Sequence, residues 1–77
     1  MIFPNRLRMA REARQLSKVA LAHTLSLSKV SIGEFESGRK VPSVNTLVML
    51  ANVLDVSVDW LTGRTDNCHS HHQDGKQ

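Results

Sequence analysis

Four side chains near the carboxyl end of the chain have the chemistry of metal ligands. They are Cys68, His69, His71 and His72, in the stretch "CHSHH". Thiolate and imidazole groups are the ligands that Zn²⁺ prefers in proteins. Their spacing matches no zinc signature, and the segment lacks apolar residues that would orient ligands. The sequence therefore favours adventitious metal affinity over a built site, and no metal or other cofactor is expected.

Combinations of residues that would indicate catalysis are also missing from the pattern. No Cys/His or Ser/His pair falls where a cleft is expected, the acidic residues are scattered, and no glycine-rich phosphate loop is present. His23 stands alone in a helical pattern and is expected at the surface. The sequence therefore predicts a protein that is not an enzyme.

Basic side chains, in contrast, gather in the first half of the chain. Residues 1–40 hold eight Lys or Arg and three Glu, a net charge of +5, whereas residues 41–77 hold two basic and four acidic residues, a net charge of −2. A basic half on a small domain suggests an anionic partner, with nucleic acid as the leading candidate. A solvated basic surface would explain the charge equally well, so charge alone does not decide.

Length and composition limit the class of protein. A chain of 77 residues with 40% hydrophobic residues forms one domain with a modest core. No apolar run has membrane-spanning length, and the N-terminus lacks the order of a secretory signal, so no membrane partner is expected. Cys68 is the only cysteine, which excludes an intramolecular disulfide and suits a reducing, cytoplasmic location.

Helix signals recur along the chain, whereas the alternation typical of strands is absent. The expected helices cover about 6–15, 18–25, 29–37, 44–54 and 58–62. Each one follows a residue whose side chain can cap a helix: Asn5, Ser17, Ser28, Ser43 and Ser57. Gly38 and Gly63 are expected to end the third and fifth helices. The pattern predicts an all-α domain over residues 1–63, followed by a polar, flexible tail over residues 64–77.

The second and third expected helices are joined by about three residues. This spacing forces a sharp angle between them, the arrangement called a helix-turn-helix. The apolar residues agree with that arrangement, since one set can face inward from both helices and the turn: Leu21, Ala22, Leu25, Leu27, Ile32 and Phe35. Ala22 must be small, because the two helices cross near it.

Residues 5–63 resemble the Xre/Cro-type helix-turn-helix domain of phage repressors, Cro proteins and bacterial relatives. The resemblance is carried by "LSKVALAHTLSLSKVSIGEFESGRKVPS" followed by "LVMLANVLDVSVDWLTGRTD". It implies a five-helix, lambda-repressor-like fold that acts as a homodimer on palindromic operator DNA. It also implies that the helix over residues 29–37 lies in the major groove of double-stranded DNA.

The resemblance further implies roles for individual residues. Those expected to contact DNA are Lys18, Ser28, Lys29, Val30, Ser31, Glu34, Arg39 and Lys40. Lys29 can bond guanine, Val30 can pack on a thymine methyl, and Glu34 can accept from cytosine. Ser31 can reach a base or a phosphate, and Lys18, Arg39 and Lys40 suit phosphates. Arg11 and Glu36 occupy positions that form a partly buried salt bridge in this family, which would fix the recognition helix.

Several residues depart from the usual family pattern. Ser26 replaces the glycine usual in the motif turn, a position that tends to need positive φ, which costs a non-glycine residue ~1 kcal/mol. Gln15 stands where a helix-ending Gly or Asn is common. Gly33 interrupts the third helix, and either close approach to DNA, tight packing on the second helix, or simple tolerance would account for it. Glu34 would repel phosphates unless it meets a cytosine amine or turns towards Lys29 or Arg39.

One alternative function uses the same fold as a protein-interaction module. Val58 and Trp60 could form an apolar patch for self-association or for a partner such as the toxin of an antitoxin pair. Packing of Trp60 on the fourth helix beside Leu61 is an equally good explanation. A co-purifying toxin would favour the interaction module, whereas a lone dimer on a palindrome would favour the repressor.

Overall fold

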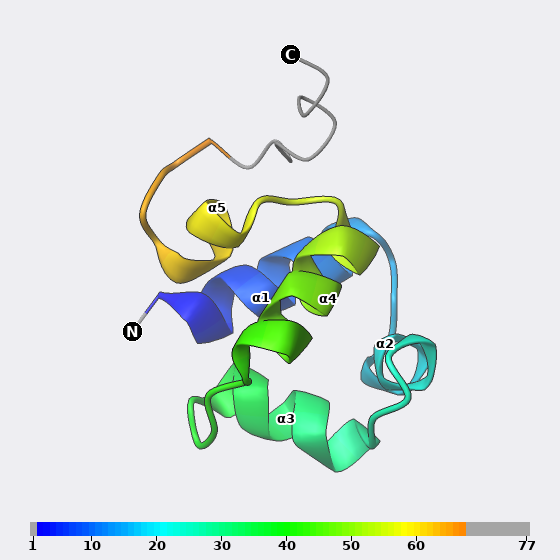
Figure 1. Cartoon of the computed structure of the whole chain (residues 1–77). Helices are drawn as coiled ribbons and strands as arrows, with labels where there is room; N and C mark the ends of the chain where they lie inside the picture. The colour runs from blue at the N-terminus through cyan, green and yellow to red at the C-terminus, as the bar shows by residue number, and fades with distance from the viewer. Residues whose placement is uncertain (1, 68–77) are drawn as a thin grey trace.

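A computed structural model describes residues 2–67 of the chain, and this part forms five helices connected by short loops (Figure 1). They are α1 (Phe3–Ala13), α2 (Lys18–Thr24), α3 (Lys29–Ser37), α4 (Val44–Leu54) and α5 (Val58–Thr62). The all-α fold expected from the sequence is therefore confirmed. Across residues 2–67, each helix is too short or too polar to cross a bilayer.

The core lies where α1 packs against α3 and α5, α2 packs against α3, and α4 packs against α5. Its five side chains with no more than a trace of exposure come from all five helices: Leu7, Leu21, Ile32, Leu50 and Leu61. The residues expected to face inward from α2 and α3 are buried, and Leu27 packs against the core from the turn. The 3.6-residue apolar periodicity therefore identified the inner faces correctly.

Serine side chains begin four of the five helices, as the sequence predicts. The hydroxyls of Ser17, Ser28, Ser43 and Ser57 each accept a hydrogen bond from the backbone N–H three residues on, at 2.9–3.2 Å. The predicted cap at Asn5 is wrong, because α1 begins two residues before it. Pro4 occupies the first turn, where its missing N–H costs nothing, and Phe3 and Pro4 are buried.

All five helices end in the same backbone motif, with one residue in the left-handed region. The residue after it donates its N–H to a carbonyl five positions back, as Leu27 does to Ala22 at 2.8 Å. Gly38 and Gly63 end α3 and α5 as predicted, whereas Gln15, Ser26 and Asp55 adopt φ of 58° without being glycine. Each of these three is followed by an apolar residue that packs on the core, namely Leu16, Leu27 and Val56. This packing offsets the backbone strain.

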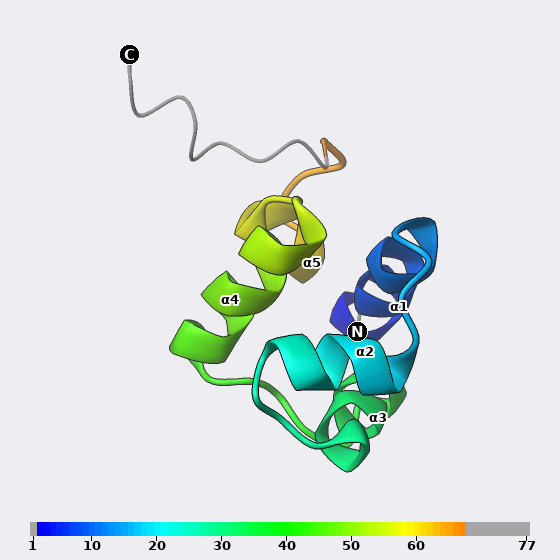
Figure 2. The same ribbon diagram turned by 90° about the vertical axis from the view of Figure 1, so that its right-hand side faces the viewer.

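The turn between α2 and α3 brings the two helices across one another (Figure 2). Ala22 is buried at this crossing, in agreement with its small size. Gly33, in contrast, has open space around the position that a Cβ would occupy. The suggested tight packing of Gly33 on α2 is therefore wrong.

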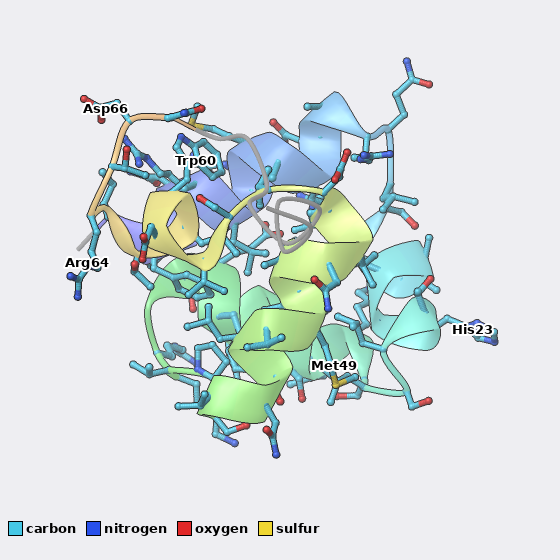
Figure 3. The ribbon with its side chains drawn as sticks, turned by 45° about the horizontal axis from the view of Figure 1, so that its top comes forward. His23, Met49, Trp60, Arg64 and Asp66 are labelled. Carbon is cyan, nitrogen blue, oxygen red and sulfur yellow. The ribbon has the colours of Figure 1, made fainter. Side chains whose placement is uncertain are left out.

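Of the two alternatives for Trp60, the exposed apolar patch is wrong, and Trp60 packs in the hydrophobic core. Trp60 is only 9% exposed, and the guanidinium of Arg6 lies 4.9 Å from the centre of its ring. Arg6 also donates to the carbonyl oxygens of Trp60 and Thr65 and to the carboxylate of Asp66. Figure 3 shows Trp60 and Asp66 on the same side of the molecule, and His23 pointing outward. Contacts with α1 thus extend three residues beyond the predicted domain boundary at residue 63.

The possible metal ligands Cys68, His69, His71 and His72 lie outside the described residues. Between residues 2 and 67, no cluster of three or more His, Cys, Asp or Glu side chains could hold a metal ion.

Candidate nucleic-acid interface

A shallow hollow of about 500 Å³ runs along the exposed side of α3. Five of the eight residues that the family resemblance assigns to DNA binding line it: Lys18, Lys29, Val30, Glu34 and Arg39. The fold brings them together because α2 begins beside the middle of α3, while Arg39 directly follows the end of α3. Gly33 and Ser37 complete the lining. The resulting surface combines three cations, one carboxylate and one apolar side chain.

The amino-terminal turn of α3 presents the side chains best placed to meet a partner. Ser28 is the cap, and its hydroxyl lies 3.1 Å from both the backbone nitrogen and the hydroxyl of Ser31. This pairing fixes both serines at the helix start. Val30 is 67% exposed and places an apolar side chain on this charged surface. An exposed apolar side chain therefore stands between Lys29 and Ser31 in the first turn of α3.

Glu34 is held by a neighbour that the sequence did not indicate. Its carboxylate lies 3.9 Å from the ammonium group of Lys40, not beside Lys29 or Arg39 as expected. The turn at Gly38 produces this pair, since it folds residues 39 and 40 back so that both backbone N–H groups donate to the Glu34 carbonyl. Lys40 therefore stands beside the hollow, and the carboxylate is partly neutralised.

Behind this surface, Arg11 and Glu36 form the paired contact that the family resemblance implies. The Arg11 Nε and Nη2 atoms donate to the two Glu36 carboxylate oxygens at 2.6 and 3.1 Å. Nη1 donates to the Leu16 carbonyl at 2.8 Å. We call these contacts the Arg11–Glu36 clamp, which joins α1, the loop after α1 and α3. Both side chains are largely buried, at 10% and 5% exposed.

The hydrogen bond to Glu36 raises the pKa of Arg11 above its ordinary value, against the opposing effect of burial. A raised pKa means that the charged form is bound more tightly in the folded state. That contribution is complete below the pKa of the unfolded chain and is lost only as pH rises through the higher folded value. Arg11 therefore keeps the clamp charged across the neutral range.

A second hollow, on the other side of Gly33, adds residues that sequence reasoning missed. It is lined by Arg8, Arg11, Glu12, Lys18, Gly33, Glu36 and Ser37. Lys18, Gly33 and Ser37 line both hollows, so the two hollows adjoin along α3. Arg8 was counted in the basic half but not placed. Its signal was the three-residue spacing from Arg11, which puts both on one side of α1.

Comparison with known proteins gives consistent matches. The family model described as "Helix-turn-helix" matches residues 7–61. The uncharacterized HTH-type transcriptional regulator YobD of Bacillus subtilis is 39% identical over 86% of this chain and 59% of its own length. The cryptic phage CTXphi transcriptional repressor RstR of Vibrio cholerae is 34% identical over 77% of this chain and 53% of its own length. The chain thus spans little more than half the length of these curated relatives.

Among solved structures, the P22 c2 repressor in complex with synthetic operator 9T superposes with a TM-score of 0.75. It is 26% identical, and the match covers 79% of this chain and 92% of that one. A solution structure of the DNA-binding domain of the same repressor also has a TM-score of 0.75. The five-helix arrangement is thus that of a repressor domain solved with DNA.

Proposed function

Because the chain belongs to the helix-turn-helix family, we propose that it is a sequence-specific transcriptional regulator. It binds a palindromic operator in double-stranded DNA as a homodimer, with α3 in the major groove. The relatives named above are bacterial, so a DNA target places this activity in the cytoplasm.

The observation that carries the proposal is the hollow along α3. It gathers Lys18, Lys29 and Arg39 around the most exposed side of a helix whose own start displays Val30. The hollow therefore combines cations with one exposed apolar side chain. DNA offers both complements, because phosphates attract the cations and the thymine methyl attracts an apolar group.

The residues divide by the part of DNA that each can reach. Lys29, Val30 and Glu34 lie on α3 and can meet base edges: guanine, the thymine methyl and the cytosine amine. Lys18, Arg39 and Lys40 lie at helix ends on either side of α3 and suit phosphates. Ser28 and Ser31 can bond a base or a phosphate with their hydroxyl groups. The Glu34–Lys40 pair makes the carboxylate less repulsive to a phosphate until a cytosine amine replaces the lysine.

The Arg11–Glu36 clamp acts as a positioning element for this surface. It joins α3 to α1 through a buried, two-point contact, so the recognition helix enters DNA at a fixed angle. Groups held in a fixed orientation lose less freedom on binding, which favours affinity and specificity.

Selection of bound duplexes from a random library, at near-physiological salt, tests the proposal. We expect an enriched palindrome with half-sites about one helical turn apart. Binding without enrichment, with a steep dependence on salt, would mean that the basic residues of the first half supply only non-specific affinity for DNA. A protein partner would then become the better explanation of the fold.

Substitution of Lys29 by alanine tests the division between base and phosphate contacts. If Lys29 reads a base, Lys29→Ala relaxes selection at one position of the half-site, at ~1–3 kcal/mol of discrimination. Arg39→Ala is the matched control, because it should weaken all sequences alike and reduce the salt dependence by about one phosphate. Equal binding of Lys29→Ala and wild-type protein to every sequence would remove Lys29 from the interface.

A further inference from the structure

Four cations stand on the surface along α3 that we assign to DNA, the DNA-binding face, and one of them differs from the others. Three line the hollow and have no acidic partner in the part of the chain that the structure describes: Lys18, Lys29 and Arg39. The fourth, Lys40, stands beside the hollow with its ammonium group 3.9 Å from the Glu34 carboxylate. A phosphate can bind the first three cations directly, whereas for Lys40 it competes with Glu34.

The backbone at the end of α3 keeps Glu34 and Lys40 next to one another. Gly38 adopts φ of 82°, which turns the chain back after the helix. The N–H groups of Arg39 and Lys40 then donate to the Glu34 carbonyl at 3.0 and 3.3 Å. These bonds anchor Lys40 beside Glu34 whether or not the two charged groups are in contact. The ion pair can therefore break and form again in place.

Glu34 needs a hydrogen-bond donor once DNA covers the hollow. Its side chain is 32% exposed in the free protein, so water still hydrates part of the carboxylate. A duplex seated on α3 excludes that water, and an ionised carboxylate without a partner is costly there. Two donors can replace the water: the N4 amine of cytosine in the major groove and the Lys40 ammonium group. Guanine offers only the acceptors N7 and O6, so on guanine Glu34 depends on Lys40.

We propose that Lys40 couples the recognition of one base to the binding of one phosphate, an inference that rests on the proposed function. Where Glu34 meets cytosine, the amine satisfies the carboxylate, and Lys40 is released to bind a phosphate. Where Glu34 meets guanine, Lys40 stays on the carboxylate, and the phosphate contact is lost. The wrong base at this position therefore removes a base contact and a phosphate contact together, which makes Lys40 a specificity-determining residue.

Salt dependence distinguishes this coupling from a simple phosphate contact. Each phosphate bound by a cation adds about 0.9 to the slope of log affinity against log salt concentration. A lysine that binds a phosphate on every sequence gives the same slope on every sequence. The coupling instead makes the slope steeper on cytosine than on guanine, by up to about 0.9. Between about 50 and 200 mM salt, affinity for the cytosine site then falls by a factor up to about 3.5 larger.

The test measures affinity against salt for two duplexes that differ in one base of one half-site, cytosine or guanine. The position is the one at which Glu34→Ala loses the selection that the wild-type protein shows. Wild type should give the steeper slope on the cytosine duplex. Lys40→Ala should give the shallower slope on both duplexes, because its phosphate contact is gone. Glu34→Ala should give the steeper slope on both, because the phosphate then has no competitor for Lys40.

Arg39→Ala is the matched control, because Arg39 shares the backbone contact to Glu34 but has no acidic partner between residues 2 and 67. It should lower the slope equally on both duplexes and keep the difference between them. Equal slopes of the wild-type protein on the two duplexes would overturn the proposal, and so would a difference that persists in Lys40→Ala. An enriched palindrome with equal slopes overturns the coupling alone, whereas a library selection that enriches no sequence overturns the proposed function as well.

Discussion

Helix α1 carries two largely buried arginines, and the two differ in what they bind. Arg11 meets a carboxylate, that of Glu36, which is itself only 5% exposed. Arg6 meets two backbone carbonyls, the ring of Trp60 and the carboxylate of Asp66, which is fully exposed. Each arginine ties α1 to another part of the chain: Arg11 to the recognition helix α3, and Arg6 to α5 and residues 64–66.

The difference shows that similar burial of an arginine can have different consequences. Arg11 and Glu36 depend on each other, because either one alone would be a poorly hydrated charge. Arg6 depends mainly on neutral acceptors, which lose a hydrogen bond but no counter-charge when it is removed. Loss of Arg11 or Glu36 should therefore disturb both the fold and the DNA-binding face, whereas loss of Arg6 should disturb only the end of the domain.

The largest effect is expected from Glu36→Gln, which removes the charge of one clamp partner and keeps its shape. The Arg11 guanidinium then has no buried counter-charge, and we expect the free energy of unfolding to fall by ~3–5 kcal/mol. For a domain of this size, that is a large part of the total stability. Urea denaturation followed by circular dichroism measures it, and a loss below ~1 kcal/mol would contradict the assigned dependence.

The matched control replaces both partners, as Arg11→Met/Glu36→Leu. Because no charge is left buried, most of the lost stability should return. DNA selectivity should return less completely if the two-point contact also sets the angle of α3. Full recovery of both properties would mean that any well-packed pair can hold the recognition helix.

Arg6→Met should have a smaller effect on stability. The carbonyls of Trp60 and Thr65 lose a donor and the Trp60 ring loses its cation, for a cost of ~1–3 kcal/mol. Amide hydrogen exchange should accelerate in α5 and around Thr65 but not in α3. Operator affinity, measured well below the unfolding midpoint, should stay at the wild-type value. Faster exchange in α3 would show that the contacts of Arg6 are coupled to the Arg11–Glu36 clamp.

The serine caps of α3 and α5, the two helices that these arginines tie to α1, extend the comparison. Ser28→Ala and Ser57→Ala each remove an N-terminal hydrogen bond, at ~1 kcal/mol. Ser57 is buried, so its loss leaves the Trp60 N–H without water and should cost more than loss of the exposed Ser28. Thermal denaturation ranks the two variants. A larger loss of thermal stability in Ser28→Ala than in Ser57→Ala would contradict the burial argument. Only Ser28→Ala should also weaken operator binding.

Asp66→Asn should have the smallest effect. Its carboxylate is fully exposed and screened by salt, and Arg6 keeps both carbonyl partners. We expect no resolvable shift of the urea midpoint at about 0.15 M salt, which is the physiological ionic strength. A shift as large as that of Arg6→Met would assign the role of Arg6 to the ion pair in place of the carbonyls.

Much of the fold follows from local sequence. Ser17, Ser28, Ser43 and Ser57 mark helix starts because a serine hydroxyl satisfies an N–H that the first turn leaves unpaired. Apolar periodicity gives the inner faces, because burial of apolar surface supplies the main driving force for folding. These are short-range properties, and the sequence determined them without reference to the rest of the molecule.

Other features depend on contacts between distant residues, and only the tertiary structure decided them. Trp60 was predicted as an exposed patch or a core residue with equal weight, and Arg6, 54 residues earlier in the chain, covers it. Helix α1 begins at Phe3, before the predicted start at residue 6, because Phe3 and Pro4 are buried. Glu34 pairs with Lys40 because the turn at Gly38 folds the chain back. Local propensity contains none of this information, since each outcome is set by which surfaces meet when the helices pack.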